Sequence, residues 1–179
     1  TAVPEQRSAI PLLSLGQGLL LTGNAMLISV NGLTGLLLAP DVRIATLPVT
    51  CFVLVGALST LPMSLLMQRR GRAFGFALGC LAAVIAALLT ALAVSRGSFW
   101  LLCLGTFIIG FYNAAGQYLR FAAVDLSPPG KQARAISLVL AGGLFGAFLG
   151  PALSRATIDM ASHRYLATYL SMIGLVLLF

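Results

Sequence analysis

The stretch Gln68-Arg69-Arg70-Gly71-Arg72 separates two apolar segments, residues 44–67 and 73–94, that are each long enough to cross a lipid bilayer. Three arginines within five residues cannot enter the hydrocarbon region at low cost, so both flanking segments must end there. Arginine clusters beside membrane spans mark the cytoplasmic side. The stretch therefore predicts a membrane protein and places this turn inside the cell.

The composition also indicates a helical membrane protein. Of the 179 residues, 59% are hydrophobic and 8% are charged, and the mean hydropathy of +1.02 leaves too little polar surface to cover a soluble globule. Backbone exposed to lipid must satisfy its own hydrogen bonds, which leaves helices or a closed barrel. Because the apolar segments are too long and too uniform for barrel strands, the predicted fold class is all-α.

Six apolar segments are expected to span the membrane as one transmembrane domain over residues 1–179. The chain begins at Thr1 and stops within an apolar segment at Phe179, so we expect it to be part of a longer protein. The first four spans cover about residues 12–38, 44–67, 73–94 and 99–121, the fifth ends near residue 153, and the sixth starts near residue 165.

The basic residues orient these spans. Seven of them fall on the predicted cytoplasmic side and four outside, which agrees with the positive-inside rule and places both ends of the segment in the cytoplasm. The net charge of +7 comes without interleaved aromatic residues, so we expect anionic lipid headgroups, and not nucleic acid, as its counter-charge. We expect a bacterial inner membrane. The inner set is Arg7, Arg69, Arg70, Arg72, Arg120, Lys131 and Arg134, and the outer set is Arg43, Arg96, Arg155 and Arg164.

Polar side chains inside the spans indicate either a water-filled path or contacts between helices. The fourth span carries four of them at intervals of seven, four and three, which places them on one helical stripe, and the first span carries two asparagines seven residues apart. Both interpretations stay open, since amides commonly bond across packed membrane helices. The candidates for the solute path are Asn24, Asn31, Thr106, Tyr112, Asn113 and Gln117.

Charged residues are scarce within the spans. Arg120 lies near the cytoplasmic end of the fourth span, where we expect snorkelling or an ion pair with Asp125 instead of contact with a solute. No Asp, Glu or Lys lies deep within a span. A coupling proton would therefore need a carrier elsewhere in the protein, or Asp41 at the outer end of the first span.

Catalytic and metal-binding patterns are missing from the sequence. Cys51, Cys80 and Cys103 lie in three different spans without CxxC spacing, and the single histidine, His163, belongs to a loop. Neither Gly-x-Ser-x-Gly nor His-Glu-x-x-His occurs. We expect no enzyme, no cofactor and no metal site.

Three glycines form a ridge on the fifth span. Gly142, Gly146 and Gly150 are four residues apart, and Pro151 follows. Such a ridge lets a neighbouring helix approach closely, while the proline leaves a carbonyl unpaired and favours a bend. We expect this span to pack tightly and to rock; packing without motion is the alternative.

Together these features resemble the amino-terminal half of a major facilitator superfamily transporter. The turn after the second span is similar to that family's Gly-x-Leu-Ala-Asp-Arg-x-Gly-Arg-Arg signature, with Arg69, Gly71 and Arg72 matching. It departs from the signature at Ser64, where the family has glycine, and at Gln68, where the family has aspartate.

Two further stretches carry the resemblance. The region from Arg120 through Asp125 to Arg134 is similar to the exit of the fourth span and the following loop in many members. The fifth-span ridge and its proline look like the Gly-x-x-x-Gly-Pro signature of antiporter branches.

The resemblance implies a secondary transporter in which two six-helix halves, each a 3+3 repeat, rock about a midplane site, with the first and fourth spans lining the path. It implies a carboxy-terminal half as partner, a small-molecule solute, and proton-coupled efflux as one mode. Because Gln68 is neutral where the family has aspartate, it would make weaker hydrogen bonds, and the closed cytoplasmic end would be held less firmly. The alternatives are a non-transporting scaffold or receptor of transporter ancestry and, less favoured, an intramembrane enzyme. The implied gate residues are Gln68, Arg69, Gly71, Arg72, Arg120, Asp125 and Arg134.

Overall fold

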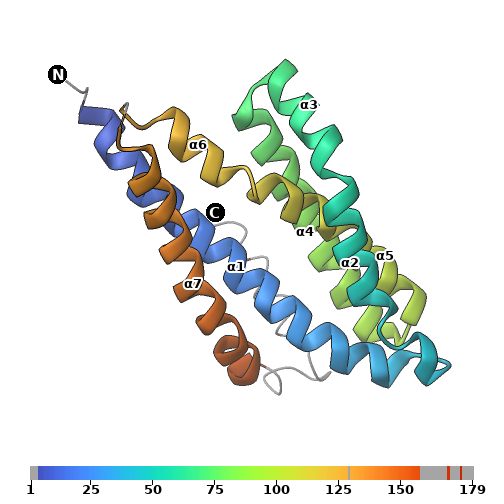
Figure 1. The fold of residues 1–179 in the computed structure, drawn as a ribbon. Helices are drawn as coiled ribbons and strands as arrows, with labels where there is room; N and C mark the ends of the chain where they lie inside the picture. Colours follow the sequence, from blue (N-terminus) through green and yellow to red (C-terminus); the bar gives the residue numbers. More distant parts are fainter. Residues whose placement is uncertain (1–3, 129, 158–168, 170–173, 175–179) are drawn as a thin grey trace.

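The computed structural model describes residues 4–128 and 130–157, together with Tyr169 and Gly174. In this part of the chain every regular element is a helix, which confirms the predicted all-α class (Figure 1). The sixth predicted span lies outside the described residues, apart from Tyr169 and Gly174. The elements are α1 (Pro4–Leu38), η1 (Val42–Ile44), α2 (Leu47–Leu58), α3 (Thr60–Arg70), α4 (Arg72–Arg96), α5 (Phe99–Gly116), α6 (Leu119–Asp125) and α7 (Gln132–Thr157).

The described helices match the first five predicted spans in length and hydropathy. Four candidate spans run over Ile10–Leu38, Arg72–Arg96, Phe99–Asp125 and Gln132–Ala156, and the pair Val42–Leu58 and Thr60–Arg70 makes a fifth. Large apolar side chains such as Leu12, Leu61 and Phe148 are exposed on these helices. That outward apolar surface is what lipid contact requires.

The second span is bent, which the sequence interpretation of one continuous segment missed. Its two halves, α2 and α3, meet at Ser59 and differ in direction by 44°. The cause is local: Pro62 has no N–H to donate to the Leu58 carbonyl, so the helical hydrogen-bond ladder is interrupted one turn before the proline. The Thr60 hydroxyl donates to the Gly56 carbonyl at 3.0 Å beside this break.

Glycines end the helices where the sequence predicts turns. Gly71 between α3 and α4 has a φ of 87°, and Gly97 after α4 has a φ of 64°. This left-handed region is open to glycine at little cost, which explains the tight reversal in the arginine stretch. At the opposite end, the exposed Asp41 side chain caps η1 by accepting a 2.9 Å hydrogen bond from the Arg43 backbone N–H.

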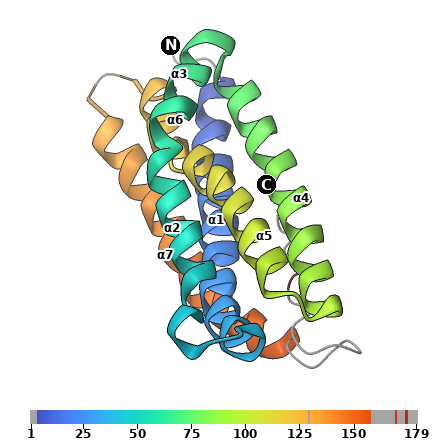
Figure 2. The same cartoon turned by 90° about the vertical axis from the view of Figure 1, so that its right-hand side faces the viewer.

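The helices pack as two groups that share a central contact. Helix α1 lies along α7, while α5 packs between α2 and α4, and α6 crosses toward α7 (Figures 1 and 2). The amino terminus, the α3–α4 turn and the start of α7 lie at one end of the bundle, which we call the arginine end (Figure 2). The main apolar core joins both groups and includes Leu20, Leu27, Phe52, Leu102 and Ile109.

Candidate functional site

The glycine ridge of α7 lies against the backbone of α1. A Cβ added at Gly146 would collide with the Gly18 carbonyl, and one added at Gly150 would come within 2.6 Å of the Thr22 carbonyl oxygen. The Thr22 hydroxyl donates to the Gly146 carbonyl at 3.0 Å. The two backbones therefore approach as closely as glycine permits.

The first glycine of the ridge and its proline complete this contact. A Cβ at Gly142 would collide with Ser14 of α1, whose hydroxyl donates to the Leu138 carbonyl of α7 at 2.9 Å. Pro151 lies inside α7, which continues to Thr157. All three predicted ridge glycines thus face one helix, α1. The sequence alone did not indicate which helix the ridge would contact.

A direct amide contact joins α1 to α5 in the middle of the bundle. Asn24 Nδ2 donates to Asn113 Oδ1 at 2.8 Å. Each asparagine lies halfway along its candidate span, Ile10–Leu38 or Phe99–Asp125. The bond across helices fits the interpretation of these amides as interhelical contacts, and the partial exposure of Asn113 fits the interpretation as a path.

The polar contacts continue from Asn113 along α5 and α6 toward the arginine end. Gln117 Nε2 donates to Asn113 Oδ1 at 3.3 Å, and Arg120 Nη2 donates to Gln117 Oε1 at 2.6 Å. Of the two expectations for Arg120, snorkelling or an ion pair with Asp125, the ion pair is not formed, and Arg120 donates to Gln117 instead. The reason is helical phase, since residues five apart lie on different faces while residues three apart are neighbours.

Three other path candidates are enclosed within the described bundle. Asn31 is 0% exposed, and its Oδ1 accepts a 2.6 Å hydrogen bond from the Tyr169 hydroxyl. Thr106 is also 0% exposed and donates its hydroxyl proton to the Cys103 carbonyl of its own helix. Tyr112 is buried against Gly79 of α4. None of the three shares the Asn24–Asn113 contact.

Gln17 is a polar residue of α1 that the sequence analysis overlooked. It is 2% exposed, its Oε1 has no hydrogen-bond partner in the described part of the chain, and its side chain lies against Gly143 of α7. Gln17 precedes Asn24 by seven residues, as Asn24 precedes Asn31. Extending the seven-residue spacing by one step would have found it.

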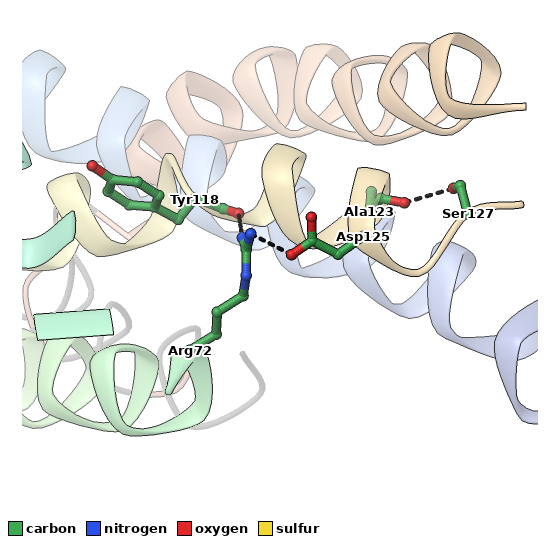
Figure 3. A network of polar contacts seen from close by, with 5 residues as sticks. All are labelled: Arg72, Tyr118, Ala123, Asp125 and Ser127. Atoms are coloured by element: carbon green, nitrogen blue, oxygen red, sulfur yellow. Dashed lines mark hydrogen bonds and ion pairs between the residues drawn. The ribbon is translucent and has the colours of Figure 1, made fainter. Parts of the chain in front are cut away.

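At the arginine end, Arg72 connects the start of α4 to α5 and α6. Figure 3 shows its guanidinium between the Asp125 carboxylate and the Tyr118 carbonyl. Arg72 Nη2 lies 2.5 Å from Asp125 Oδ2, and Nη1 donates to the Tyr118 carbonyl at 3.4 Å. Arg72 and Asp125 both belong to the set of gate residues that the family resemblance implies. Both charged side chains are partly open to solvent, at 35% and 58%, so the ion pair is weak by itself.

A pocket of about 350 Å³ surrounds this ion pair. Gln68 and Ser64, the two positions that depart from the signature, both line it. Arg69, Arg70 and Arg134 are exposed and are not among the lining residues, and Arg70 lies over the Phe74 ring at 5.1 Å. The lining residues are Ser64, Met67, Gln68, Arg72, Tyr118, Phe121, Val124 and Asp125.

Tyr118 is a second residue that sequence analysis missed. Its hydroxyl donates to the Thr60 carbonyl at 2.8 Å, which ties the α5–α6 junction to the bend between α2 and α3. Its position one residue after Gln117 places it off the polar stripe, so periodicity did not select it.

The described residues hold no group of three His, Cys, Asp or Glu side chains placed as metal ligands. The arrangement consists of amides at mid-membrane depth and an ion pair at one end. Such a pattern can bind a polar solute and close one end of a path, by hydrogen bonds and charge.

Known proteins are similar to this chain over most of its length. A family model described as Major Facilitator Superfamily matches residues 13–179. The riboflavin transporter RfnT of Brucella anthropi is 40% identical over 147 residues, which cover 82% of this chain and 37% of that protein. The uncharacterized MFS-type transporter YdeG of Bacillus subtilis (strain 168) is 32% identical over 117 residues, which cover 65% of this chain and 27% of that protein. The chain therefore spans less than half the length of these two curated relatives.

Proposed function

The chain belongs to the major facilitator superfamily, and on this premise we propose that the whole protein is a secondary transporter that moves a small solute by alternating access. The observation that carries the proposal is the Asn24–Asn113 hydrogen bond, which places two amides together halfway along two apolar spans. Polar groups at that depth are costly unless they serve a site or a helix contact. Transport sites of this kind lie near the membrane midplane.

Residues 1–179 are proposed to form one six-helix half of the transporter. The remaining length of the relatives leaves room for a second half of similar size. The solute would bind between the halves, so the half-buried Asn113 and Gln117 are better placed to meet it than the enclosed Asn31, Thr106 and Tyr112.

The protein is an integral membrane protein, and we place it in a bacterial inner membrane with the arginine end in the cytoplasm. The support is the excess of Lys and Arg at that end. There, Gln68, Arg69, Gly71, Arg72, Arg120, Asp125 and Arg134 are proposed to form a cytoplasmic gate whose closed form the Arg72–Asp125 pair stabilises.

Riboflavin is the solute we propose. The support is the 40% identity to a riboflavin transporter over 82% of this chain. Amide side chains can also hydrogen-bond to the flavin ring. The ring carbonyls accept from amide N–H groups, and the imide N–H donates to an amide oxygen.

Proton-coupled efflux is the second candidate mode, favoured by Gly146, Gly150 and Pro151, which look like the antiporter signature. The four acidic residues of the sequence, Glu5, Asp41, Asp125 and Asp159, lie outside the middle of the spans. A proton carrier is therefore proposed to lie in the remainder of the protein.

The test is flux by the full-length protein in proteoliposomes. Riboflavin loaded on one side should cross faster than in empty liposomes, and an imposed pH gradient should accelerate it only if protons are coupled. Flux equal to that of empty liposomes, for riboflavin in both directions and with either gradient, would favour the scaffold or receptor alternative.

A further inference from the structure

We propose that Asn24 and Asn113 form a recognition pair for an amide or imide edge of the solute. In this arrangement Asn113 Nδ2 donates to a solute carbonyl, and Asn24 Oδ1 accepts from the neighbouring solute N–H. The inference rests on the proposed transport function and names the chemical group by which the solute is bound.

The orientation of the pair originates at Arg120. A guanidinium has only donors, so the Gln117 atom that meets Arg120 Nη2 at 2.6 Å must be the acceptor Oε1. The Gln117 amide nitrogen is then turned toward Asn113, where it donates to Oδ1 at 3.3 Å. Arg120 thereby sets the orientation of two successive amides.

Asn113 Oδ1 is occupied by two donors, Gln117 Nε2 and Asn24 Nδ2. The direction of the Asn113 amide is fixed by both, so its remaining group is the Nδ2 donor. Asn24 uses one of its two N–H donors on the same oxygen, so its second N–H and its Oδ1 acceptor remain. The pair therefore keeps a donor at Asn113 Nδ2 and an acceptor at Asn24 Oδ1.

The second hydrogen bond that could close an amide pair is not made. Within the described part of the chain, Asn113 Nδ2 donates to no acceptor and Asn24 Oδ1 accepts from no donor. Neither belongs to the buried unpaired polar atoms of the described side chains, which are Gln17 Oε1, Asn31 Nδ2 and Thr34 Oγ1. Asn24 is 9% exposed and Asn113 is half-buried, and the proposal assigns the remaining donor and acceptor of the pair to the ligand.

Gly56 of α2 lies directly beside the donor. A Cβ added at Gly56 would lie 2.9 Å from Asn113 Nδ2, and its next contact, the Gly110 carbonyl oxygen, would be 3.8 Å away. Gly56→Ala should therefore push the amide group aside without a collision between backbones. Gly32 is the matched control, since a Cβ there has no atom within 4 Å.

The test measures equilibrium binding of riboflavin and of 3-methylriboflavin to the purified full-length protein, by quenching of flavin fluorescence. The two probes share both ring carbonyls and differ in the imide N–H. We expect riboflavin to bind about tenfold more tightly, the effect of about one hydrogen bond of 1.4 kcal/mol. Gly56→Ala should weaken riboflavin binding about tenfold by the same reasoning, and Gly32→Ala should not.

The positioning role of Arg120 has its own readout, the ratio of the two affinities. Arg120→Met removes the donor that orients Gln117, so the ratio should fall from about tenfold to within about twofold. Arg120→Lys, which also offers only donors, should keep the ratio. A purely structural role would change both affinities together and leave the ratio unchanged.

The outcomes separate the two proposals. A ratio that survives Arg120→Met, or riboflavin binding unaffected by Gly56→Ala, overturns the recognition pair while transport of riboflavin stands. Binding with the expected ratios but without flux supports the pair and overturns transport. A wild-type protein that binds neither probe overturns both.

Discussion

Helix α1 meets α7 and α5 in different ways. On the face toward α7 the contact is between backbones: Gly18 and Gly146 leave no room for a Cβ, and Thr22 bonds the carbonyl of the opposite helix. On the face toward α5 the helices touch less extensively, and the central contact is the hydrogen bond from Asn24 to Asn113.

The difference shows how one helix can have a fixed packing contact on one side and an exchangeable hydrogen bond on the other. Lipid tails are as apolar as leucine, so close van der Waals packing of small residues must replace the hydrophobic effect between membrane helices. Those van der Waals contacts are lost if the two helices move apart. An amide pair contributes only about 1 kcal/mol and can be exchanged for a hydrogen bond to a solute or to water.

Breaking the glycine face should have the largest effect. Gly146→Leu places a side chain on the Gly18 backbone, so α1 and α7 must separate; we expect destabilisation of more than about 3 kcal/mol, as for severe overpacking, and loss of flux with membrane insertion intact. Thermal unfolding in detergent and flux in proteoliposomes measure the two effects. Gly32→Leu, which enters open space, is the control, and normal flux by Gly146→Leu would contradict the close contact.

Removing the amide contact should have a smaller effect. In a double-mutant cycle of Asn24→Leu and Asn113→Leu, we expect a coupling energy of about 0.5–1.5 kcal/mol, the range found for hydrogen bonds between membrane helices. Unfolding titrations of the four proteins provide it. Strictly additive effects would show that the bond does not hold α1 to α5.

The ion pair at the arginine end should contribute less still. Both partners are partly exposed, so a cycle of Arg72→Ala and Asp125→Ala should reveal a coupling of about 0–1 kcal/mol that decreases with added salt. The same unfolding assay at low and high ionic strength measures it. A coupling well above that range, or one indifferent to salt, would mean that the pair is more enclosed in the whole protein than in the described part.

The smallest change in stability should follow Gln68→Asp, which adds a carboxylate to the pocket around Arg72 and Asp125. A carboxylate accepts stronger, charge-assisted hydrogen bonds than an amide, so the arginine end should stay closed longer. We expect a shift toward the outward-open state, seen as faster labelling of cysteine probes on the outer side and slower labelling on the inner side. Unchanged labelling on both sides is the contrary result.

Sequence patterns anticipated much of the fold because their physical causes are local. Hydropathy and length located five of the described spans, and Gly71 and Gly97 marked the turns. The bend at Ser59 also has a local cause, Pro62, and could have been predicted from the missing N–H of the proline. The sixth span lies outside the described residues and stays a prediction.

The candidate site was less predictable. The seven-residue spacing of Asn24 and Asn31 placed both on one face of α1, yet one bonds α5 and the other bonds Tyr169. Gln117 and Arg120 were correctly placed on one stripe. An ion pair with Asp125 was one of two expectations for Arg120, and the partner of Asp125 is Arg72. Helical periodicity specifies the direction of a side chain from its own axis and contains no information on which helix it meets.

By itself, the sequence determined that the chain is helical, where it crosses the membrane, and on which stripe each polar residue lies, because these depend on hydrocarbon thickness and on 3.6 residues per turn. Only the tertiary structure decided that the glycine ridge faces α1, that Asn24 meets Asn113, and that Arg72 reaches Asp125. Those contacts depend on how the helices are rotated and crossed against one another, and that is settled by the packing of all of them at once.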